Sequence, residues 1–484
     1  MKKSFKPVVV FIAFTIFISC SKKEVLPPSP SGPVPSAAQL QWHEMEQNAF
    51  IHFTTNTFTD LEWGNGDEKP SVFNPVNVDA NQWITTLKDA GFKGVILTCK
   101  HHDGFCLWPS QYTKHSVKNS PYKNGKGDVV REVSEACKRH GLKFGVYLSP
   151  WDRNHAGYGK PAYIEYYRNQ LKEIFTSYGP VFEMWFDGAN GGTGYYGGAN
   201  EKRSINGAEY YDWPATLDLV RQMEPNVIFF SDAGPGVRWV GNEKGIAGET
   251  NWNSITPDTL FAGKGGIEKL LNTGHENGTH WIPAEVDVSI RPGWFYHARE
   301  DSLVKSPEKL FEIYLTSVGR GSTLLLNVPP DRRGLIHEKD VAALQGWKKM
   351  LEEEFKTNYA ANAKVTADSY RGDDDKYGAA KILDGDKETY WSTDDEVTAG
   401  SVEIDLGKPV IVKYILLQEY IKLGQRVKAF TVEVWKDGAW QKAAEATTIG
   451  YKRILKIEPV ETDKVRVNIT ESKACPVISS IEVY

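Results

Sequence analysis

The sequence predicts an α/β fold, a (β/α)8 TIM-type barrel over residues 40–357, followed by an all-β sandwich over residues 358–484. Short apolar runs of strand length predict the barrel, because amphipathic segments with the period of an α-helix lie between them. After Val365 the helical period ends, and apolar residues alternate with polar ones as they do in strands. This change of pattern predicts a second domain of antiparallel strands.

The barrel elements follow one another over about 300 residues, the usual span of this fold. The predicted strands are 49–53, 94–99, 144–149, 182–187, 226–232, 245–250, 281–289 and 323–328. The predicted helices are 81–90, 129–140, 162–177, 215–223, 307–317 and, as the last helix of the barrel, 338–355. The fifth to seventh units are the least regular, so the number of strands there is open by one.

The second domain is predicted from six runs with strand-like alternation. They read SVEIDLG, VKYILLQEY, AFTVEVW, RILKIEP, KVRVNIT and SSIEVY. Alternation of period two places apolar side chains on one face of a strand and polar side chains on the other. Two sheets that pack through their apolar faces form a β-sandwich.

The N-terminus begins with Lys2 and Lys3, followed by an apolar run over residues 8–18. This run is too short to span a membrane comfortably, so residues 1–19 are predicted to be a signal peptide. Cys20 follows a small residue and resembles a bacterial lipoprotein cleavage site, which implies lipidation of Cys20 and a place in the cell envelope, in the periplasm or on the outer membrane surface. The alternative is an ordinary signal peptide with an incidental cysteine. Residues 20–39, rich in Pro and Ser, are predicted to form a flexible tether.

Composition excludes several classes of function. The net charge of −5, with acidic and basic residues nearly balanced, gives no basic surface of the kind that binds nucleic acid. The four other cysteines show neither a CxxC motif nor paired spacing, which excludes a zinc framework and a disulfide scaffold. The 15 Trp and 22 Tyr residues would suit stacking against sugar rings, although a large protein also carries many aromatic residues in its core.

Polar and aromatic residues follow the predicted strands at their C-terminal ends, where barrel enzymes build their active sites. They are His52, Glu62, Trp63, Lys100, His101, His102, Asp103, Tyr147, Trp151, Asp187, Asp232, Arg238, Trp239, Asn242, Glu243, Lys244, Glu249, Glu285, Asp287, Arg291, Trp294 and Asn327. Carboxylates, imidazoles and indoles dominate this set. Two carboxyl groups that flank a glycosidic bond can hydrolyse it, so glycoside hydrolysis is the predicted chemistry.

The same residues raise two alternatives, a metal site and a serine nucleophile. His101, His102 and a nearby Asp could ligate a metal ion, but adjacent residues of an extended segment point to opposite sides. Histidines that bind substrate hydroxyls are therefore the preferred interpretation, and the metal question stays open. A serine nucleophile is not indicated, because the sequence contains no GxSxG motif.

An ordered set of motifs resembles the α-L-fucosidases of glycoside hydrolase family 29. The motifs are FIHFTTNTF, LEWGNG, LTCKHHDGFCLWPS, FGVYLSPWDR, EMWFDGANG, RWVGNEKG, RPGWFYH and LLLNVPPDRRG. They occur in the family's order over most of residues 42–335. The resemblance implies that Asp187 is the catalytic nucleophile of a retaining mechanism, and that Glu243 of the GNE motif is the acid/base. Glu249 and Glu285 remain rivals for the second role.

The resemblance also implies a set of substrate-binding residues: His52, Glu62, Trp63, His101, His102, Tyr147, Trp185, Arg238 and Trp294. Residues 191–207, rich in Gly and Tyr, depart from the family pattern and are expected to form an enlarged loop at the mouth of the pocket. The C-terminal domain resembles the discoidin-like, jelly-roll domains of carbohydrate-binding family 32. That likeness implies a structural calcium ion and, in some members, sugar binding.

RWVGNEKG resembles the branch of the family that is specific for α-1,3- or α-1,4-linked fucose. The resemblance therefore implies a retaining exo-α-L-fucosidase that removes terminal fucose with these linkages from glycans and needs no cofactor for catalysis. Its expected partners are fucosylated oligosaccharides or glycoconjugates, and a membrane through the lipid anchor. Two alternatives within the same class are broad activity that includes α-1,2 linkages and hydrolysis of a related sugar such as an α-L-galactoside. An alternative of another class is a non-catalytic glycan-binding surface lipoprotein.

Overall fold

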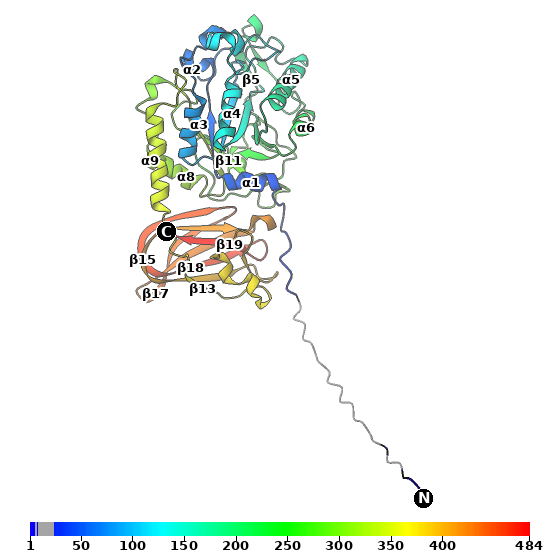
Figure 1. Cartoon of the computed structure of the whole chain (residues 1–484), viewed down its shortest axis with the longest axis vertical. Helices are drawn as coiled ribbons and strands as arrows, with labels where there is room; N and C mark the ends of the chain where they lie inside the picture. Colours follow the sequence, from blue (N-terminus) through cyan, green and yellow to red (C-terminus); the bar gives the residue numbers. More distant parts are fainter. Residues whose placement is uncertain (5–6, 8–23) are drawn as a thin grey trace.

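A computed structural model describes residues 1–4, 7 and 24–484 of the 484-residue chain. The chain forms a barrel, drawn at the top of Figure 1, and a β-domain below it. Most of the predicted signal peptide and Cys20 lie outside the described residues. Within the described residues, no helix combines the length and apolar character that a membrane crossing requires.

Eight parallel strands close the barrel, as predicted. They are β1 (Gln47–Ile51), β2 (Gly94–Lys100), β3 (Lys143–Leu148), β4 (Glu183–Trp185), β7 (Ile228–Ser231), β8 (Val237–Trp239), β11 (Ala284–Ser289) and β12 (Thr323–Asn327). The order around the barrel is β1-β12-β11-β8-β7-β4-β3-β2. β1 closes the ring because it pairs with β12 through Gln47 and Leu324 and with β2 through Asn48 and Gly94.

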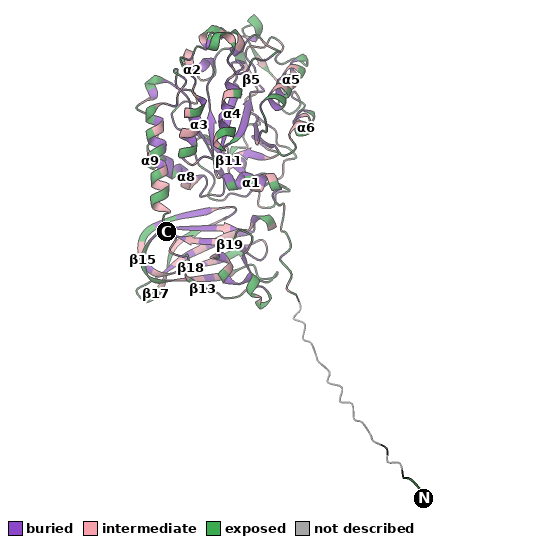
Figure 2. Cartoon of the chain, in the orientation of Figure 1, coloured by how far each residue is buried: buried purple, intermediate pink, exposed green. Residues whose placement is uncertain are grey.

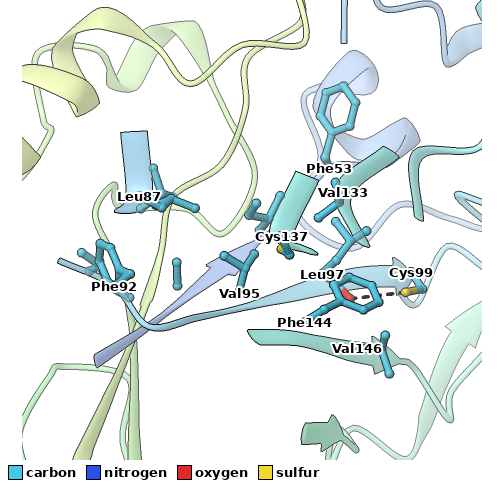
Figure 3. Close-up of a cluster of buried hydrophobic side chains, with 14 of the residues drawn as sticks. Phe53, Leu87, Phe92, Val95, Leu97, Cys99, Val133, Cys137, Phe144 and Val146 are labelled. Carbon is cyan, nitrogen blue, oxygen red and sulfur yellow. Dashed lines mark hydrogen bonds between the residues drawn. The ribbon is translucent and has the colours of Figure 1, made fainter. Parts of the chain in front are cut away.

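Amphipathic helices cover the outside of the barrel (Figure 2). They are α3 (Ala80–Asp89), α4 (Val129–His140), α5 (Ala162–Ser177), α6 (Trp213–Met223), α8 (Pro307–Thr316) and α9 (Glu338–Glu354). Two shorter helices, α2 (Thr55–Thr59) and α7 (Glu268–Thr273), lie in loops that follow β1 and β8. The side chain of Asp128 accepts a hydrogen bond from Arg131 N and caps α4, which ends at Gly141 in the left-handed conformation. Figure 3 shows Val133 and Cys137 of α4 close to Leu97 of β2, in the apolar layer between helix and sheet.

The predicted sixth strand, residues 245–250, is wrong. The sixth strand is β8, and residues 232–236 join it to β7 without a helix. Gly236 N donates to Phe229 O, so the chain turns back within a few residues and runs parallel to β7. Residues 245–250 lie outside the ring, where Ala247 N bonds to Thr316 O at the end of α8. The apolar pattern does not reveal β8, because the strand has only three residues and one of them is a buried arginine.

Helix α1 (Ala37–Met45) covers the end of the barrel at which the strands begin. Ser36 and Gln39 form a capping box at its start. The indole of Trp42 enters the barrel and donates to Glu183 Oε2 at 3.1 Å, at the first residue of β4. Since this end is closed, the site must lie at the opposite end, where the strands finish.

The C-terminal domain consists of antiparallel strands, as predicted. They are β13 (Lys364–Ala367), β14 (Trp391–Ser392), β15 (Gly400–Glu419), β16 (Val427–Lys436), β17 (Ala439–Ala446), β18 (Arg453–Ser472) and β19 (Val477–Val483). β15 and β18 pair along most of their length with two register shifts. Alternate residues such as Val402, Ile404, Val465 and Val467 are buried and form a separate core. Outside the two domains' main sheets, β5 (Gly191–Gly194) pairs with β6 (Glu201–Ser204), and β9 (Ser254–Ile255) with β10 (His280–Trp281).

The two domains pack against each other, and part of the predicted tether lies along the C-terminal domain. Phe355 after α9 packs against Tyr414 of β15 with ring centroids 5.3 Å apart. Ser31 N donates to Leu423 O at 3.0 Å, and Arg426 donates to Ser29 O at 2.7 Å. The prediction of a flexible tether is therefore wrong for these residues. Extended Pro- and Ser-rich chain offers free main-chain carbonyls, and the C-terminal domain supplies donors for them.

Candidate active site

Asp187 lies two residues after the end of β4 and points into the open end of the barrel. Tyr147 OH donates to its Oδ2 at 2.9 Å, and Ala189 N donates to its Oδ1 at 2.7 Å. The side chain is 23% exposed, so one face remains accessible. Gly188 is needed next to it, because a Cβ there would lie 2.0 Å from Asp232 Oδ2. The barrel thus holds a partly exposed carboxylate in a fixed direction.

His102, which lies beside Asp187, is held in one tautomer. Ser149 Oγ donates to Trp151 O, so it accepts from Nδ1 of His102 at 2.7 Å. Nε2 of His102 then faces Asp187 Oδ2 at 3.8 Å. Burial lowers the pKa of His102, although the charge of Asp187 opposes this effect. A neutral His102 therefore presents an Nε2 lone pair to the pocket.

His52 is held in the same way on the other side of the pocket. Asn327 donates through Nδ2 to Ser289 Oγ and Trp294 O, so its Oδ1 accepts from His52 Nδ1 at 2.8 Å. Burial lowers the pKa of His52 to about 3. Its neutral ring also presents Nε2 as an acceptor. His101 lies between the two, with its ring centroid 4.1 Å from that of His102 and 5.5 Å from that of His52.

Aromatic side chains form the walls of the pocket. Trp185 stacks on Phe230 with centroids 3.9 Å apart and an interplanar angle of 5°. Trp294 packs against His52 at 5.3 Å. Trp63 is 53% exposed and meets His102 edge to face at 5.8 Å. Exposed and half-buried indole faces next to polar groups suit the apolar face of a sugar ring.

Glu243 lies in the loop after β8, at the rim of the same pocket. Trp294 Nε1 donates to its Oε2 at 3.4 Å. Partial burial raises the pKa of Glu243; the hydrogen bond from Trp294 opposes this rise, and the charges of Asp187 and Glu62 add to it. The raised pKa suits a group that carries a proton and gives it up.

Glu62 lies next to the pocket and holds one of its walls. Its Oε2 accepts from Trp294 N at 2.8 Å, and its Oε1 lies 2.5 Å from His297 Nε2. His297 Nδ1 in turn lies 2.6 Å from Asp60 Oδ1. Glu62 therefore fixes the segment that carries Trp294.

The structure does not bring the remaining candidates to Asp187. Glu249 is 77% exposed and pairs with Arg320 at 3.2 Å, beside the C-terminal domain. Glu285 is fully buried inside the barrel, where it accepts from Trp185 Nε1 at 3.0 Å. Burial, followed by the neighbouring charge of Glu183, raises the pKa of Glu285 well above its usual value. Arg238 is also fully buried, and its donors are bound to main-chain and amide oxygens outside the barrel.

Sequence reasoning did not assign roles to Ser149, Asn327 or Asp232. Ser149 and Asn327 set the histidine tautomers, and Asp232 contacts the Asp187 turn and accepts from Gly263 N at 2.7 Å. Burial raises the pKa of Asp232 to about 6. Position at the end of a strand was the available signal, since each residue ends or follows one. Among the described residues, no group of three or more His, Cys, Asp or Glu side chains could hold a metal ion.

Comparison with protein families shows which family the chain belongs to. The sequence profile of the α-L-fucosidase family matches residues 31–354, which include the whole barrel. The chain belongs to glycoside hydrolase family 29, the α-L-fucosidases. The resemblance inferred from the motifs is thereby confirmed, and the enzyme acts on fucosylated glycans. The profile of the F5/8 type C domain matches residues 364–483, so the β-domain of this fucosidase is discoidin-like.

Relatives cover both domains of the fucosidase. Alpha-L-fucosidase 1 of Arabidopsis thaliana is 41% identical over 94% of this chain and 88% of its own length. A glycoside hydrolase family 29 member from an unknown rumen bacterium is 46% identical, with a TM-score of 0.85 over 94% of this chain and 78% of the other. A Ruminococcus gnavus family 29 fucosidase in complex with fucose is 34% identical, with a TM-score of 0.86 over 96% and 97%.

Proposed function

We propose that this fucosidase is a retaining exo-enzyme that removes terminal α-1,3- and α-1,4-linked L-fucose by double displacement. Asp187 attacks the anomeric carbon as the bond to the leaving sugar breaks, and Glu243 transfers its proton to the departing oxygen. A fucosyl ester on Asp187 results. Water then gives a proton to Glu243 and attacks the anomeric carbon, which releases L-fucose with retained configuration and restores both groups.

One observation carries this assignment: Asp187 and Glu243 differ in their surroundings in the way the two roles require. Asp187 accepts two hydrogen bonds, which stabilise a carboxylate. Glu243 has its pKa raised, mainly by partial burial, which keeps a proton available at higher pH. The charge of Asp187 contributes to that rise and disappears in the fucosyl ester, so the pKa of Glu243 falls when it must act as a base.

The neutral histidines supply specific contacts for the sugar. His52 and His102 present Nε2 acceptors, so hydroxyl groups of fucose would donate to them. A hydroxyl between His102 Nε2 and Asp187 Oδ2 would separate two acceptors that now lie 3.8 Å apart. Trp294 would cover the apolar side of the ring, including the methyl group that distinguishes fucose from galactose.

Chemical rescue tests the acid/base role. In Glu243→Ala, aryl fucosides with good leaving groups should still form the ester, and added azide should restore turnover with a fucosyl azide of retained configuration. The anomeric configuration of the first product, followed by NMR on the wild type, tests retention. An inverted product would refute double displacement. Absence of azide rescue would refute the role of Glu243.

The linkage preference rests on the GNE motif around Glu243 and on the shape of the rim. The β5–β6 hairpin stands beside the pocket: Trp151 Nε1 donates to Tyr196 OH at 2.9 Å, and Arg153 donates to Thr193 O at 2.7 Å. A panel of 2'-fucosyllactose, 3-fucosyllactose and Lewis trisaccharides tests the preference. Equal cleavage of 2'-fucosyllactose would favour the broad-specificity alternative.

The C-terminal domain is proposed to hold a structural calcium ion. Thr389 Oγ1 lies 2.9 Å from both carboxyl oxygens of Asp384, 3.1 Å from Asp386 O and 3.4 Å from Lys381 O. One hydroxyl proton cannot serve so many oxygens, and an oxygen cluster of this kind fits calcium. A melting temperature that falls on chelation and recovers with calcium, but not in Asp384→Ala, would support this proposal. Unchanged melting would refute it.

The mature enzyme is proposed to be a lipoprotein of the bacterial cell envelope, anchored through Cys20. The apolar run of residues 8–18 and the cysteine that follows a small residue carry this proposal. Labelling with a fatty-acid analogue in the native host should mark the wild type and not Cys20→Ser. A soluble, unlabelled wild-type protein would contradict it.

A further inference from the structure

A buried arginine holds together the two ends of the loop that carries Glu243. Arg238 of β8 is 0% exposed, and its guanidinium donates to Asn251 Oδ1 at 3.0 Å and to Trp252 O at 2.9 Å. The other bonds of this guanidinium reach Leu271 O and Ile282 O. We call Arg238 with residues 251–252 the neck, and residues 239–250 the Glu243 loop. Opening the neck would leave buried donors without acceptors, which is costly.

The C-terminal domain bonds to the neck from its outer side. Gln425 donates through Nε2 to Asn251 O at 2.9 Å and accepts through Oε1 from Asn253 N at 2.8 Å. Thr448 Oγ1 accepts from Asn251 N at 2.9 Å. Asn251 is therefore bound by the C-terminal domain on its main chain and by Arg238 on its side chain, so it connects the second domain to a barrel strand.

The same domain also holds the C-terminal end of the Glu243 loop. Arg453 Nη1 and Thr447 Oγ1 both donate to Glu249 O, at 2.7 and 3.0 Å. Thr250 Oγ1 donates to Thr447 Oγ1 at 3.0 Å. Inside the C-terminal domain, buried Glu419 accepts from Arg426 N and Gly450 N, which fixes the two segments that carry these contacts.

Contacts within the barrel hold the main chain on both sides of Glu243 but leave its side chain less fixed. Asn272 Nδ2 donates to Val240 O and to Ile246 O, both at 3.1 Å. Residues 242–244 lie in neither a helix nor a strand, and Glu243, although its neighbours partly bury its carboxyl group, remains open to solvent. In the described part of the chain its side chain meets one donor, Trp294 Nε1, at 3.4 Å. Further along, Thr316 Oγ1 donates to Gly245 O at 2.8 Å. The position of Glu243 therefore depends on these contacts and on how the C-terminal end of its loop is held.

We propose that the C-terminal domain is a positioning element of the active site. Gln425 and Thr448 fix Asn251, Asn251 and Arg238 close the neck, and the closed neck keeps the Glu243 loop at the rim. Loss of these contacts lets the loop shift, and Glu243 no longer meets the leaving oxygen. This inference rests on the proposed acid/base role of Glu243. Gln425, Thr447 and Thr448 act through the loop and touch no substrate.

The test uses the full-length enzyme and aryl α-L-fucosides whose phenol leaving groups differ in pKa. Good leaving groups depart without a proton, whereas poor ones need the acid. In Gln425→Ala combined with Thr448→Val, kcat/KM for poor leaving groups should fall about tenfold to a hundredfold, with little change for good ones. Thr448→Val alone, a milder change, should show the same selectivity, and Thr448→Ser should restore the wild-type value because the hydroxyl returns.

Lys452→Ala is the matched control, since Lys452 pairs with Glu46 elsewhere at the interface of the domains. It should change both substrate classes equally or not at all. Glu243→Ala runs in parallel: a loss that is equal for good and poor leaving groups in this variant would refute the acid role itself. Selective loss in Glu243→Ala, but none in the Gln425 and Thr448 variants at unchanged melting temperature, would overturn the positioning role alone.

Discussion

The two carboxyl groups of the active site are held in opposite ways. Asp187 lies two residues after a barrel strand and accepts bonds from Tyr147 of the neighbouring strand and from Ala189 N. Glu243 lies in an irregular, exposed loop and has one long hydrogen bond from Trp294. The barrel alone therefore fixes the nucleophile, whereas the acid needs a loop, a neck and a second domain. A nucleophile such as Asp187 can be held by the strands of the barrel. An acid at the entrance, such as Glu243, depends on contacts from outside the barrel sheet.

The largest expected effect is loss of the nucleophile. Asp187→Ala should lower kcat for an aryl fucoside by about 10⁴-fold or more, because no ester can form. Asp218→Ala, on the exposed face of α6, serves as the matched carboxylate control and should retain activity. Stopped-flow release of the phenol measures both. Residual turnover within tenfold of the wild type would contradict the assignment of Asp187.

The rigid support of Asp187 is tested by removing one donor. Tyr147→Phe loses the 2.9 Å hydrogen bond but keeps the ring, so kcat should fall about 100-fold. Tyr167→Phe is the control, because its hydroxyl donates to Leu148 O and not to Asp187. It should lower the melting temperature slightly and leave kcat within about threefold. Equal losses in the two variants would mean that the hydroxyl bonded to Asp187 has no special role.

The weaker support of Glu243 predicts a smaller effect, visible in the pH profile. The Trp294 hydrogen bond lowers the pKa of Glu243 by stabilising the carboxylate. In Trp294→Phe that pKa should therefore rise, and the alkaline limb of kcat/KM should move to higher pH with a change of only a few fold at the optimum. Trp63→Phe alters the pocket without touching Glu243, so its alkaline limb should stay in place. An alkaline limb that moved to lower pH in Trp294→Phe would contradict the prediction that the Trp294 hydrogen bond lowers the pKa of Glu243.

The smallest expected effect concerns the barrel interior below Asp187. Burial raises the pKa of Glu183 from 4.5 to about 7. The folded state thus binds a proton between these values that the unfolded state has released. The stabilising contribution of this bound proton is complete below about pH 4.5 and is lost as the pH rises toward 7. In Glu183→Gln the unfolding free energy, from denaturant titration, should vary less over this window. If the unfolding free energy of Glu183→Gln varied with pH as steeply as that of the wild type, the raised pKa of Glu183 would be contradicted.

Sequence reasoning succeeded where regular geometry fixes a side chain. The barrel, seven of its eight strands and the convergence of His52, His102, Tyr147 and Asp187 at one end follow from the apolar pattern. It failed at β8, because three residues carry too little pattern and Arg238 interrupts the apolar run. The same arginine was taken for a substrate ligand, since a sequence does not reveal that its acceptors come from residues 251–252 and 282. The bonds from Glu62 to Trp294 N and His297 could not be predicted for the same reason, since these partners lie more than 200 positions away; a substrate contact of Glu62 stays a prediction.

The path of residues 25–31 places the N-terminal end of the chain on the side of the molecule opposite the pocket. These residues lie along the C-terminal domain, and α1 then enters beneath the end of the barrel that is opposite the pocket (Figure 1). A chain held at its N-terminal end would therefore turn its pocket away from the point of attachment. In the lipoprotein proposed above, the C-terminal domain would therefore stand between the pocket and the membrane.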